Sequence, residues 1–164
     1  MPDLKLLITL LPVAFALHNL EETLGMEKWT HSLRSPVLGT VTTRQFGISA
    51  LLITALGFGV ILGRDLIQND QVYFEVVAGF AGMLCLNVLF PHVLATLYYG
   101  RYAPGVVTAL LINLPLTLML LYQLHDAQTL TNPQLTKSVI IGGLAGILLV
   151  YGLLKLGRAL DRLF

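Results

Sequence analysis

The stretch Leu4–Leu24, LKLLITLLPVAFALHNLEETL, is the clearest indication of the fold of this chain. It carries no Asp, Glu, Lys or Arg between Lys5 and Glu21. A transmembrane helix needs about 20 predominantly apolar residues to span roughly 30 Å of hydrocarbon. We therefore predict that this stretch is a membrane-spanning helix and not part of a soluble core.

Four further apolar segments follow, separated by polar loops. Their ranges are 44–62, 73–98, 104–124 and 137–156. No linker or shift in composition marks a second domain. The sequence therefore predicts an all-α fold, a polytopic membrane helix bundle of five transmembrane helices, in which residues 1–164 form a single domain.

The composition excludes an ordinary soluble domain. Of the 164 residues 55% are hydrophobic and 12% are charged, and the mean hydropathy is +0.78. A typical soluble domain carries about 25% charged residues, so this chain has too little polar surface to cover a globule. The net charge is +1, and no basic tract indicates a nucleic-acid partner. Lipid must be the solvent for much of the chain.

The distribution of Lys and Arg predicts the orientation in the membrane, because cytoplasmic loops carry an excess of these residues. One side of the predicted bundle holds the N-terminus, Lys5, Arg64 and Lys137. The other side holds Lys28, Arg34, Arg44, Arg101, Lys155, Arg158 and Arg162. We therefore expect the N-terminus outside and the C-terminus in the cytoplasm, in an integral protein of a bacterial inner (plasma) membrane.

Polar residues interrupt the first predicted helix at its second half. A charged side chain at a helix centre costs about 2.5–3.5 kcal/mol on insertion scales, so such residues usually face a bundle interior and carry function. His18, Glu21 and Glu22 stand at i, i+3 and i+4 and share one helix face. Adjacent carboxylates repel unless a cation or a shared proton lies between them, and a divalent metal would meet that need. Alternatively, both glutamates lie at the helix end and reach headgroups or water.

The third predicted helix holds a second polar group, in the stretch Asn87–His92, NVLFPH. Pro91 deprives the Asn87 carbonyl of its helical donor, so we expect a kink there. The first and third helices run in the same direction, and His18 and His92 both lie a few residues past the helix midpoints. At about 1.5 Å per residue the two imidazoles fall at one depth, although His92 could also be a core histidine bonded to a carbonyl. The predicted metal ligands are His18, Glu21, Glu22 and His92.

Two residues outside these stretches are weaker candidates. His31 lies in the predicted first loop and could fold back as a further ligand, although a solvated loop histidine is the better interpretation. Tyr102 fits an aromatic belt at the membrane interface, and it could also reach the pocket from its inner mouth. His125 is predicted on the opposite side of the membrane and is excluded.

Three motifs follow one another along the chain: His18-x-x-Glu21-Glu22, Asn87 with His92, and Tyr102-Ala103-Pro104-Gly105. In membrane context and in this order they resemble the HXXEE family of small integral membrane proteins, which is similar in length and helix number. The resemblance spans residues 10 to 115, and the last helix adds no motif. The family is largely uncharacterised, and the resemblance implies only a membrane metalloenzyme.

We therefore expect a metal-dependent enzyme that acts on a lipid or other apolar small molecule entering laterally from the inner leaflet. Zn would suit a hydrolytic or isomerising reaction and Fe an oxidative one, and the ligand set does not choose between them. Glu21 or Glu22 could stay off the metal as a general base. Asn87 could support a ligand or bind substrate, and Tyr102 is a further catalytic candidate. The expected partners are membrane lipids and, in a homo-oligomer, a second copy of the chain.

Other functions stay open at the level of sequence. His18 and a glutamate could work without metal as the acid–base pair of an isomerase or cyclase. The same groups could titrate in a proton-coupled transporter, although five helices without an inverted repeat argue against ordinary secondary transport unless the protein oligomerises. A structural or assembly role would need none of these groups, so enzymatic activity itself is a prediction.

Overall fold

The computed structural model describes residues 3–33 and 40–161, which are almost entirely helical. Five stretches are long and apolar enough to cross a membrane: Leu4–Leu33, Thr43–Leu66, Asp70–Tyr99, Val106–Asp126 and Asn132–Asp161. The predicted all-α membrane bundle is therefore confirmed. The α-helices are α1 (Leu4–Leu33), α2 (Thr43–Leu62), α3 (Asp70–Asn87), α4 (Leu94–Tyr99), α5 (Val106–Thr108), α6 (Leu114–Asp126) and α7 (Asn132–Asp161). Between them lie a 3-10 turn, Gly63–Leu66, and two π-helical segments, Val88–Val93 and Ala109–Asn113.

The helix boundaries differ most from the predicted ones in the first and last helices. α1 continues to Leu33, through a stretch that the sequence predicted as loop. Its residues 26–28, Met-Glu-Lys, are good helix formers, so the helix extends beyond the hydrocarbon. α7 begins at Asn132, before the predicted start at Lys137, because Pro133 fits the first turn of a helix.

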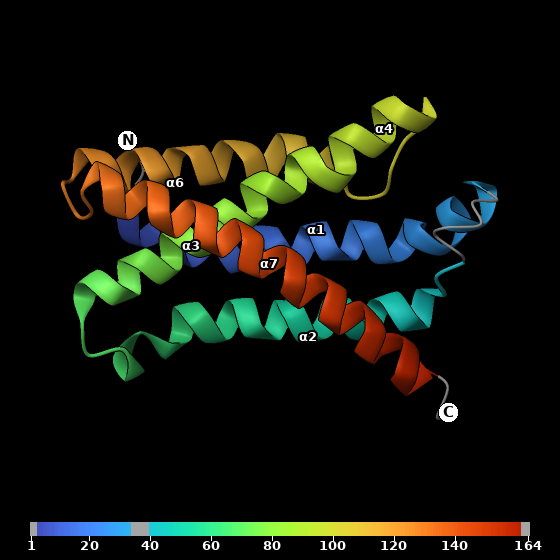
Figure 1. Cartoon of the computed structure of the whole chain (residues 1–164), viewed down its shortest axis with the longest axis horizontal. Helices are drawn as coiled ribbons and strands as arrows, with labels where there is room; N and C mark the ends of the chain where they lie inside the picture. The colour runs from blue at the N-terminus through green and yellow to red at the C-terminus, as the bar shows by residue number, and fades with distance from the viewer. Residues whose placement is uncertain (1–2, 34–39, 162–164) are drawn as a thin grey trace.

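α3 and α7 cross near the centre of the bundle, and their main chains touch there (Figure 1). A Cβ on Gly142 would overlap the main chain of Gly79, and a Cβ on Gly82 would lie 2.5 Å from the carbonyl oxygen of Val139. Small residues permit such close approach of membrane helices. The crossing fixes α7 against α3, and the two helices diverge on either side of it.

α3 does not continue straight into α4. The π-helical segment Val88–Val93 joins them, and Phe90 within it has φ −128° and ψ 117°, outside the helical range. The kink predicted at Pro91 is therefore present. Beyond it α4 leans away from α7, and the second half of α1 is visible between them (Figure 1).

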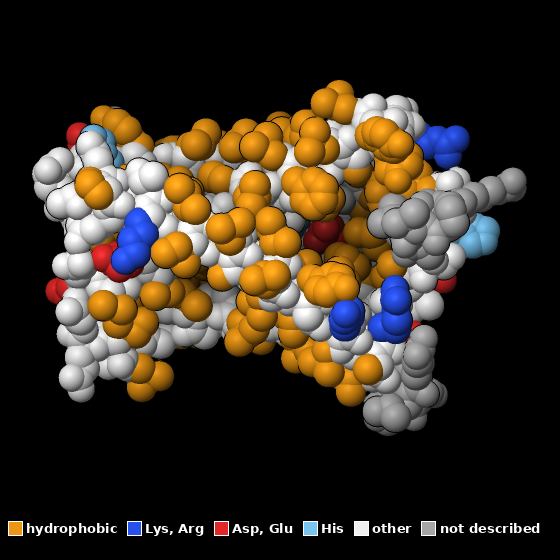
Figure 2. Space-filling model, in the orientation of Figure 1, with side chains coloured by type: hydrophobic (Ala, Val, Ile, Leu, Met, Phe, Trp, Pro, Cys, Tyr) orange, Lys and Arg blue, Asp and Glu red, His pale blue; other side chains and the backbone are white. Residues whose placement is uncertain are grey.

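Hydrophobic side chains cover the middle of the molecule, and charged ones gather at its two ends (Figure 2). Leu51, Leu97 and Leu148 are 71%, 73% and 72% exposed, as expected of side chains that face lipid. Figure 2 also shows an acidic side chain at the bottom of a hollow between α4 and α7, surrounded by hydrophobic side chains. An acidic side chain of the interior is therefore visible from this face of the bundle.

α1 begins and α7 ends at opposite ends of the bundle, as five crossings require (Figure 1). Which end faces the cytoplasm stays a prediction. Two of the basic residues on which it rests, Arg34 and Arg162, lie outside the described residues.

Candidate metal centre

His18 lies on the inner face of α1 and is fully buried. Its Nδ1 is 3.0 Å from the hydroxyl oxygen of Thr108, and that oxygen is 2.5 Å from Oε2 of Glu21. A carboxylate accepts hydrogen bonds, so the Thr108 hydroxyl donates to Glu21 and accepts from the Nδ1–H of His18. This arrangement leaves Nε2 of His18 without a proton and facing the bundle interior.

His92 reaches the same interior from the π-helical segment after α3, and it is also buried. The main-chain carbonyl of Pro104 is a hydrogen-bond partner of its ring. A carbonyl only accepts, so a ring N–H points toward Pro104. Since Nε2 is the nitrogen that faces Glu22, we assign this N–H to Nδ1. The second imidazole therefore also presents an unprotonated Nε2.

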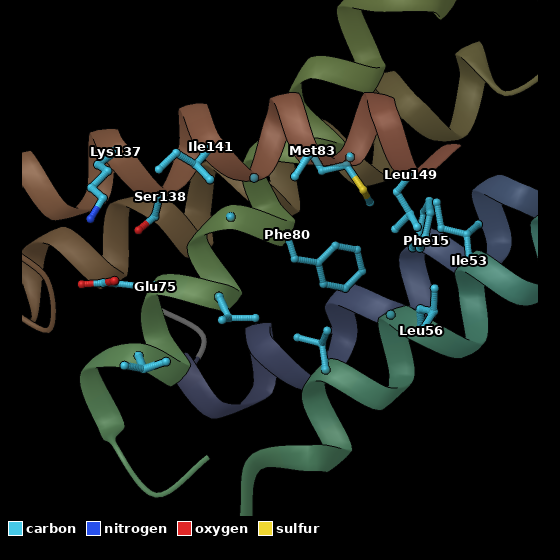
Figure 3. A pocket seen from close by; sticks show the side chains of 18 residues that line it. Phe15, Ile53, Leu56, Glu75, Phe80, Met83, Lys137, Ser138, Ile141 and Leu149 are labelled. Atoms are coloured by element: carbon cyan, nitrogen blue, oxygen red, sulfur yellow. The ribbon is translucent and has the colours of Figure 1, made fainter. Parts of the chain in front are cut away.

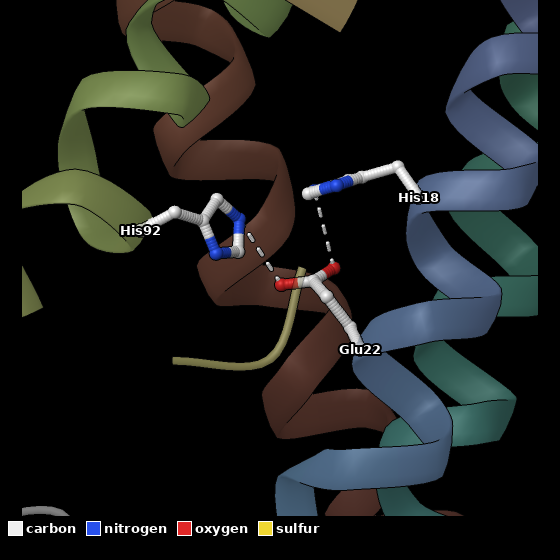
Figure 4. A group of neighbouring side chains, drawn as sticks. All are labelled: His18, Glu22 and His92. Carbon is white, nitrogen blue, oxygen red and sulfur yellow. Dashed lines mark ion pairs between the residues drawn. The ribbon is translucent and has the colours of Figure 1, made fainter. Parts of the chain in front are cut away.

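Glu22 lies between the two imidazoles (Figure 4). Its Oε2 is 3.6 Å from Nε2 of His18, and its Oε1 is 3.4 Å from Nε2 of His92. Glu22 is 8% exposed and the two histidines are 0% and 1% exposed. The three ligand atoms all lie within 4.8 Å of one another, so His18, Glu22 and His92 form a buried group that could hold a metal ion. We call these three residues the metal group.

The chemistry of these donors fits a divalent cation. Two imidazole nitrogens and one carboxylate are a ligand set of Zn and Fe sites that keep open positions. The other nitrogen of each ring is held by the Thr108 hydroxyl or the Pro104 carbonyl. Hydrogen bonds of this kind commonly orient metal-binding histidines. A divalent cation among the carboxylate and the two unprotonated nitrogens would be attracted by all three lone pairs.

The side-chain amide of Asn87, at the end of α3, contacts both imidazoles. Its Nδ2 is 2.9 Å from Nε2 of His18 and 3.2 Å from Nε2 of His92. In this orientation the amide donates to both rings. A half-turn of the amide would direct its Oδ1 to the same place and add an oxygen to the donor set. Asn87 therefore belongs to the site whether or not a metal binds there.

Gly105 closes the site from the loop before α5. Its φ of 88° lies in the left-handed region that favours glycine. A Cβ here would lie 2.7 Å from Cγ of Glu22 and Cε1 of His92, and 2.8 Å from Cε1 of His18. Gly105 and Thr108 were not predicted site residues. For Gly105 the signal was its place in the Tyr102-Ala103-Pro104-Gly105 motif. For Thr108 there was none, because a single threonine in an apolar run is too common to be a signal.

The structure does not bring Glu21 into the metal group, although the sequence predicted it as a ligand. Its carboxylate turns toward the start of α5, where it accepts hydrogen bonds from the main-chain N–H of Val107, at 3.3 Å, and of Thr108, at 2.8 Å. Free N–H groups at a helix start attract a carboxylate. Glu21 therefore supports His18 through Thr108, while Glu22 faces the two Nε2 atoms.

Tyr102, like Glu21 and Asn87 a predicted catalytic residue outside the metal group, contacts Glu21. Its hydroxyl donates a hydrogen bond to Oε1 of that carboxylate. Burial and this hydrogen bond raise the pKa of Tyr102 to about 12, so the phenol keeps its proton at neutral pH. The weaker candidate His31 is in the last turn of α1, and the excluded His125 is in the last turn of α6; both lie outside the metal group.

These residues occur together in a protein family. A family model described as a protein of unknown function with HXXEE motif matches residues 9–120. The chain belongs to the HXXEE family. The match confirms the resemblance seen in the sequence, and it covers every residue of the site: His18, Glu21, Glu22, Asn87, His92, Tyr102, Gly105 and Thr108. Most of α6 lies within the HXXEE match, and α7 lies outside it.

A similar protein occurs in Bacillus subtilis (strain 168), where it is called uncharacterized protein YrkK. It is 29% identical to this chain over 144 residues. The alignment covers 88% of this chain and 90% of the relative, so the likeness extends beyond the motifs to most of the bundle. No solved structure matches the chain significantly. Membership in the HXXEE family therefore assigns no reaction to the site.

Proposed function

We propose that this protein is a membrane-embedded, metal-dependent enzyme that acts on a lipid or other apolar small molecule. The observation that carries the proposal is the metal group, in which two Nε2 atoms and a carboxylate face one another inside the bundle. Ionisable residues within a membrane span are costly and usually mark function. A purely structural role gives no reason to direct three ligand atoms to one point.

His18, Glu22 and His92 would hold a divalent ion and leave positions open for water and substrate. Zn bound there would polarise an oxygen or activate water for hydrolysis or isomerisation, whereas Fe would support an oxidation. The two histidines would bind through Nε2. Thr108 and the Pro104 carbonyl hold their rings in place from the opposite edge.

The remaining polar residues would act on the substrate or on the ligand geometry. The amide of Asn87 lies within hydrogen-bond distance of both Nε2 atoms, so it can bind a polar group of the substrate or join the ligands. Glu21 is held by Thr108 and Tyr102, and it would orient His18 through the threonine hydroxyl. Glu22 is then the carboxylate nearest the reacting atoms.

The surroundings of the site support an apolar substrate. The metal group lies within the spans Leu4–Leu33 and Asp70–Tyr99. The hollow between α4 and α7, with an acidic side chain at its bottom, is rimmed by hydrophobic side chains (Figure 2). A molecule dissolved in the bilayer would reach this opening without crossing water. In the predicted orientation the hollow faces the inner leaflet.

Metal analysis of the detergent-purified protein tests the ligand assignment. We expect about one Zn or Fe per chain, as in other sites with three protein ligands. The double variant His18→Ala, His92→Ala and the single variant Glu22→Gln should lose it. His31→Ala and His125→Ala are matched controls because both histidines lie outside the metal group. Stoichiometric metal that persists in the double variant would overturn the assignment.

A comparison of lipid extracts tests the enzymatic part of the proposal. Bacteria that express the wild-type chain are compared with bacteria that express Glu22→Gln at the same level. We expect at least one lipid or apolar metabolite to change in abundance with the wild-type chain alone. Identical extracts would contradict an enzyme that acts on molecules dissolved in the membrane.

One observation favours a second candidate function, a metal-free isomerase or cyclase. The amide of Asn87 donates to both Nε2 atoms, so the imidazoles have partners without any ion. His18 and Glu22 would then exchange a proton with the substrate in an apolar pocket. A change in the lipid extract that depends on Glu22, produced by a protein that holds no metal, would favour this candidate over the metalloenzyme.

A further inference from the structure

A cavity lies between α2, α3 and α7, and Phe15 of α1 is part of its lining (Figure 3). Its volume is about 690 Å³, within the range of small-molecule sites. Apolar and small side chains make up most of its walls, among them Ile53, Leu56, Phe80, Met83, Ile141 and Leu149. We call this cavity the lateral groove. It does not enter the function proposed above.

The polar groups of the lateral groove gather at one end. The side chains of Glu75, Lys137 and Ser138 lie together there, and the aromatic rings lie toward the other end (Figure 3). Glu75 accepts a hydrogen bond of 2.8 Å from Gln71. Within residues 3–33 and 40–161, the ammonium of Lys137 has no ion-pair partner. Ser138 is 8% exposed, and its hydroxyl is not among the buried polar atoms of these residues. This end therefore offers an unpaired cation and a hydroxyl beside a carboxylate.

The length of the lateral groove matches one leaflet of a bilayer. The groove follows α7 from Lys137 to Leu149, twelve residues along the helix or roughly 18 Å at 1.5 Å per residue. Half of the hydrocarbon core is about 15 Å thick. The polar end lies near the start of α7, at the level of the headgroups, so the apolar part runs from there to the middle of the membrane.

The inner end of the lateral groove closes against aromatic rings. The ring of Phe15 lies edge-on to that of Phe80, with centroids 5.6 Å apart, and nearly parallel to the imidazole of His18, with centroids 6.5 Å apart. Gly57 makes room for this wall, since a Cβ there would lie 2.9 Å from Cζ of Phe80. Phe15 therefore separates the groove from the metal group.

We propose that the lateral groove binds a zwitterionic phospholipid with an amine headgroup. An acyl chain fills the apolar part, because an apolar cavity excludes water and the adjacent solvent is lipid. The phosphate pairs with Lys137 and accepts a hydrogen bond from Ser138. The headgroup amine pairs with Glu75, which would repel a purely anionic headgroup. Phosphatidylethanolamine has both charges in this arrangement.

Native mass spectrometry of the full chain, exchanged in detergent with phosphatidylethanolamine or phosphatidylglycerol, tests the proposal. We expect one retained phosphatidylethanolamine per chain and less phosphatidylglycerol. Ala145→Trp fills the groove and should abolish retention. Leu148→Trp is the control, because Leu148 is 72% exposed on the outer face of α7 and does not line the groove. Equal retention by these two variants, with both still monodisperse and helical, would overturn the site.

Two surface substitutions test the headgroup assignment without altering the fold. Lys137→Ala should weaken retention about fivefold, the effect of one lysine near lipid headgroups. Glu75→Gln should raise the retention of phosphatidylglycerol relative to phosphatidylethanolamine. Wild-type chain that prefers phosphatidylglycerol, or retention that is unchanged in Lys137→Ala, would show that these groups do not recognise the lipid.

Discussion

α1 and α7 are both 30 residues long, yet they contribute to the protein in opposite ways. In their most apolar windows, 44% of α1 is buried inside the bundle but only 11% of α7. α1 buries polar side chains, including His18, Asn19 and Glu22. The buried residues of α7 are small: Ser138, Gly143, Gly146 and Gly157. α1 therefore supplies residues of the candidate metal centre. α7 packs closely against α3, and most of the surface of α7 faces lipid.

The contrast between α1 and α7 predicts which substitutions change stability and which change metal binding. Close packing of membrane helices needs only small residues at the contact, whereas a metal group needs particular donors in one geometry. The HXXEE match ends at residue 120, before α7 begins. Substitutions in α7 should therefore act on stability, and substitutions around His18 should act on metal binding.

The largest effect on stability is expected from Gly142→Leu in α7. A side chain there overlaps the main chain of Gly79, so α7 must move away from α3. We expect a loss of about 3 kcal/mol, the upper part of the usual range for overpacking, measured as thermal unfolding in detergent. Gly152→Leu is the control, because a Cβ at Gly152 meets nothing within 4 Å. Equal melting temperatures for the two variants would show that the contact between Gly142 and Gly79 does not stabilise the bundle.

Gly105→Ala should abolish metal binding while lowering stability no more than Gly100→Ala does. Gly105 and Gly100 have φ of 88° and 60°, so alanine costs about 1–2 kcal/mol at either position. Only the Cβ at Gly105 meets the metal group, whereas the one at Gly100 meets open space. We therefore expect Gly105→Ala to lose its metal and Gly100→Ala to keep it, measured by metal analysis of folded protein. Metal that stays in both variants would show that Gly105 does not close the site.

Thr108→Val should weaken metal binding without unfolding the bundle. It removes the hydroxyl that joins Nδ1 of His18 to Glu21. Loss of such a supporting hydrogen bond typically costs 10- to 100-fold in metal affinity, so we expect about that effect in a chelator competition assay. Thr23→Val is the control, since the Thr23 hydroxyl bonds only the carbonyl of Asn19 in its own helix. Equal affinities in the two variants would remove Thr108 from the site.

The smallest effect is expected from Tyr102→Phe at high pH. The pKa of Tyr102 is raised from 10.0 to about 12 by burial and the Glu21 hydrogen bond, so the folded state favours the protonated phenol. Its contribution to stability is therefore present below pH 10 and is lost as the pH rises toward 12. Melting curves should show less decline over this range in Tyr102→Phe than in Tyr98→Phe, whose ring packs on Tyr99 instead. Parallel declines would contradict the Glu21 contact.

Much of the candidate site was predictable, because it depends on position along the helices. His18 and His92 were expected at one depth from the helical rise alone, and their ring centroids lie 4.6 Å apart. The kink at Pro91 followed from the missing N–H of proline. The two glutamates show what could not be predicted from the sequence. Relative to His18, position i+3 lies about 60° to one side of the helix and i+4 about 40° to the other, so spacing alone could not separate Glu21 from Glu22.

Three features follow from the amino-acid sequence: lipid is the solvent, five helices cross it, and certain polar residues share a level. They follow because hydropathy and helical rise are properties of single segments of the chain. The packing of the helices was needed to show that Glu22 and not Glu21 faces the imidazoles, and that Gly105 and Thr108 contact the metal group. The same packing forms the lateral groove between α2, α3 and α7. These features depend on how each helix is rotated and crossed against its neighbours, which packing sets and no single segment encodes.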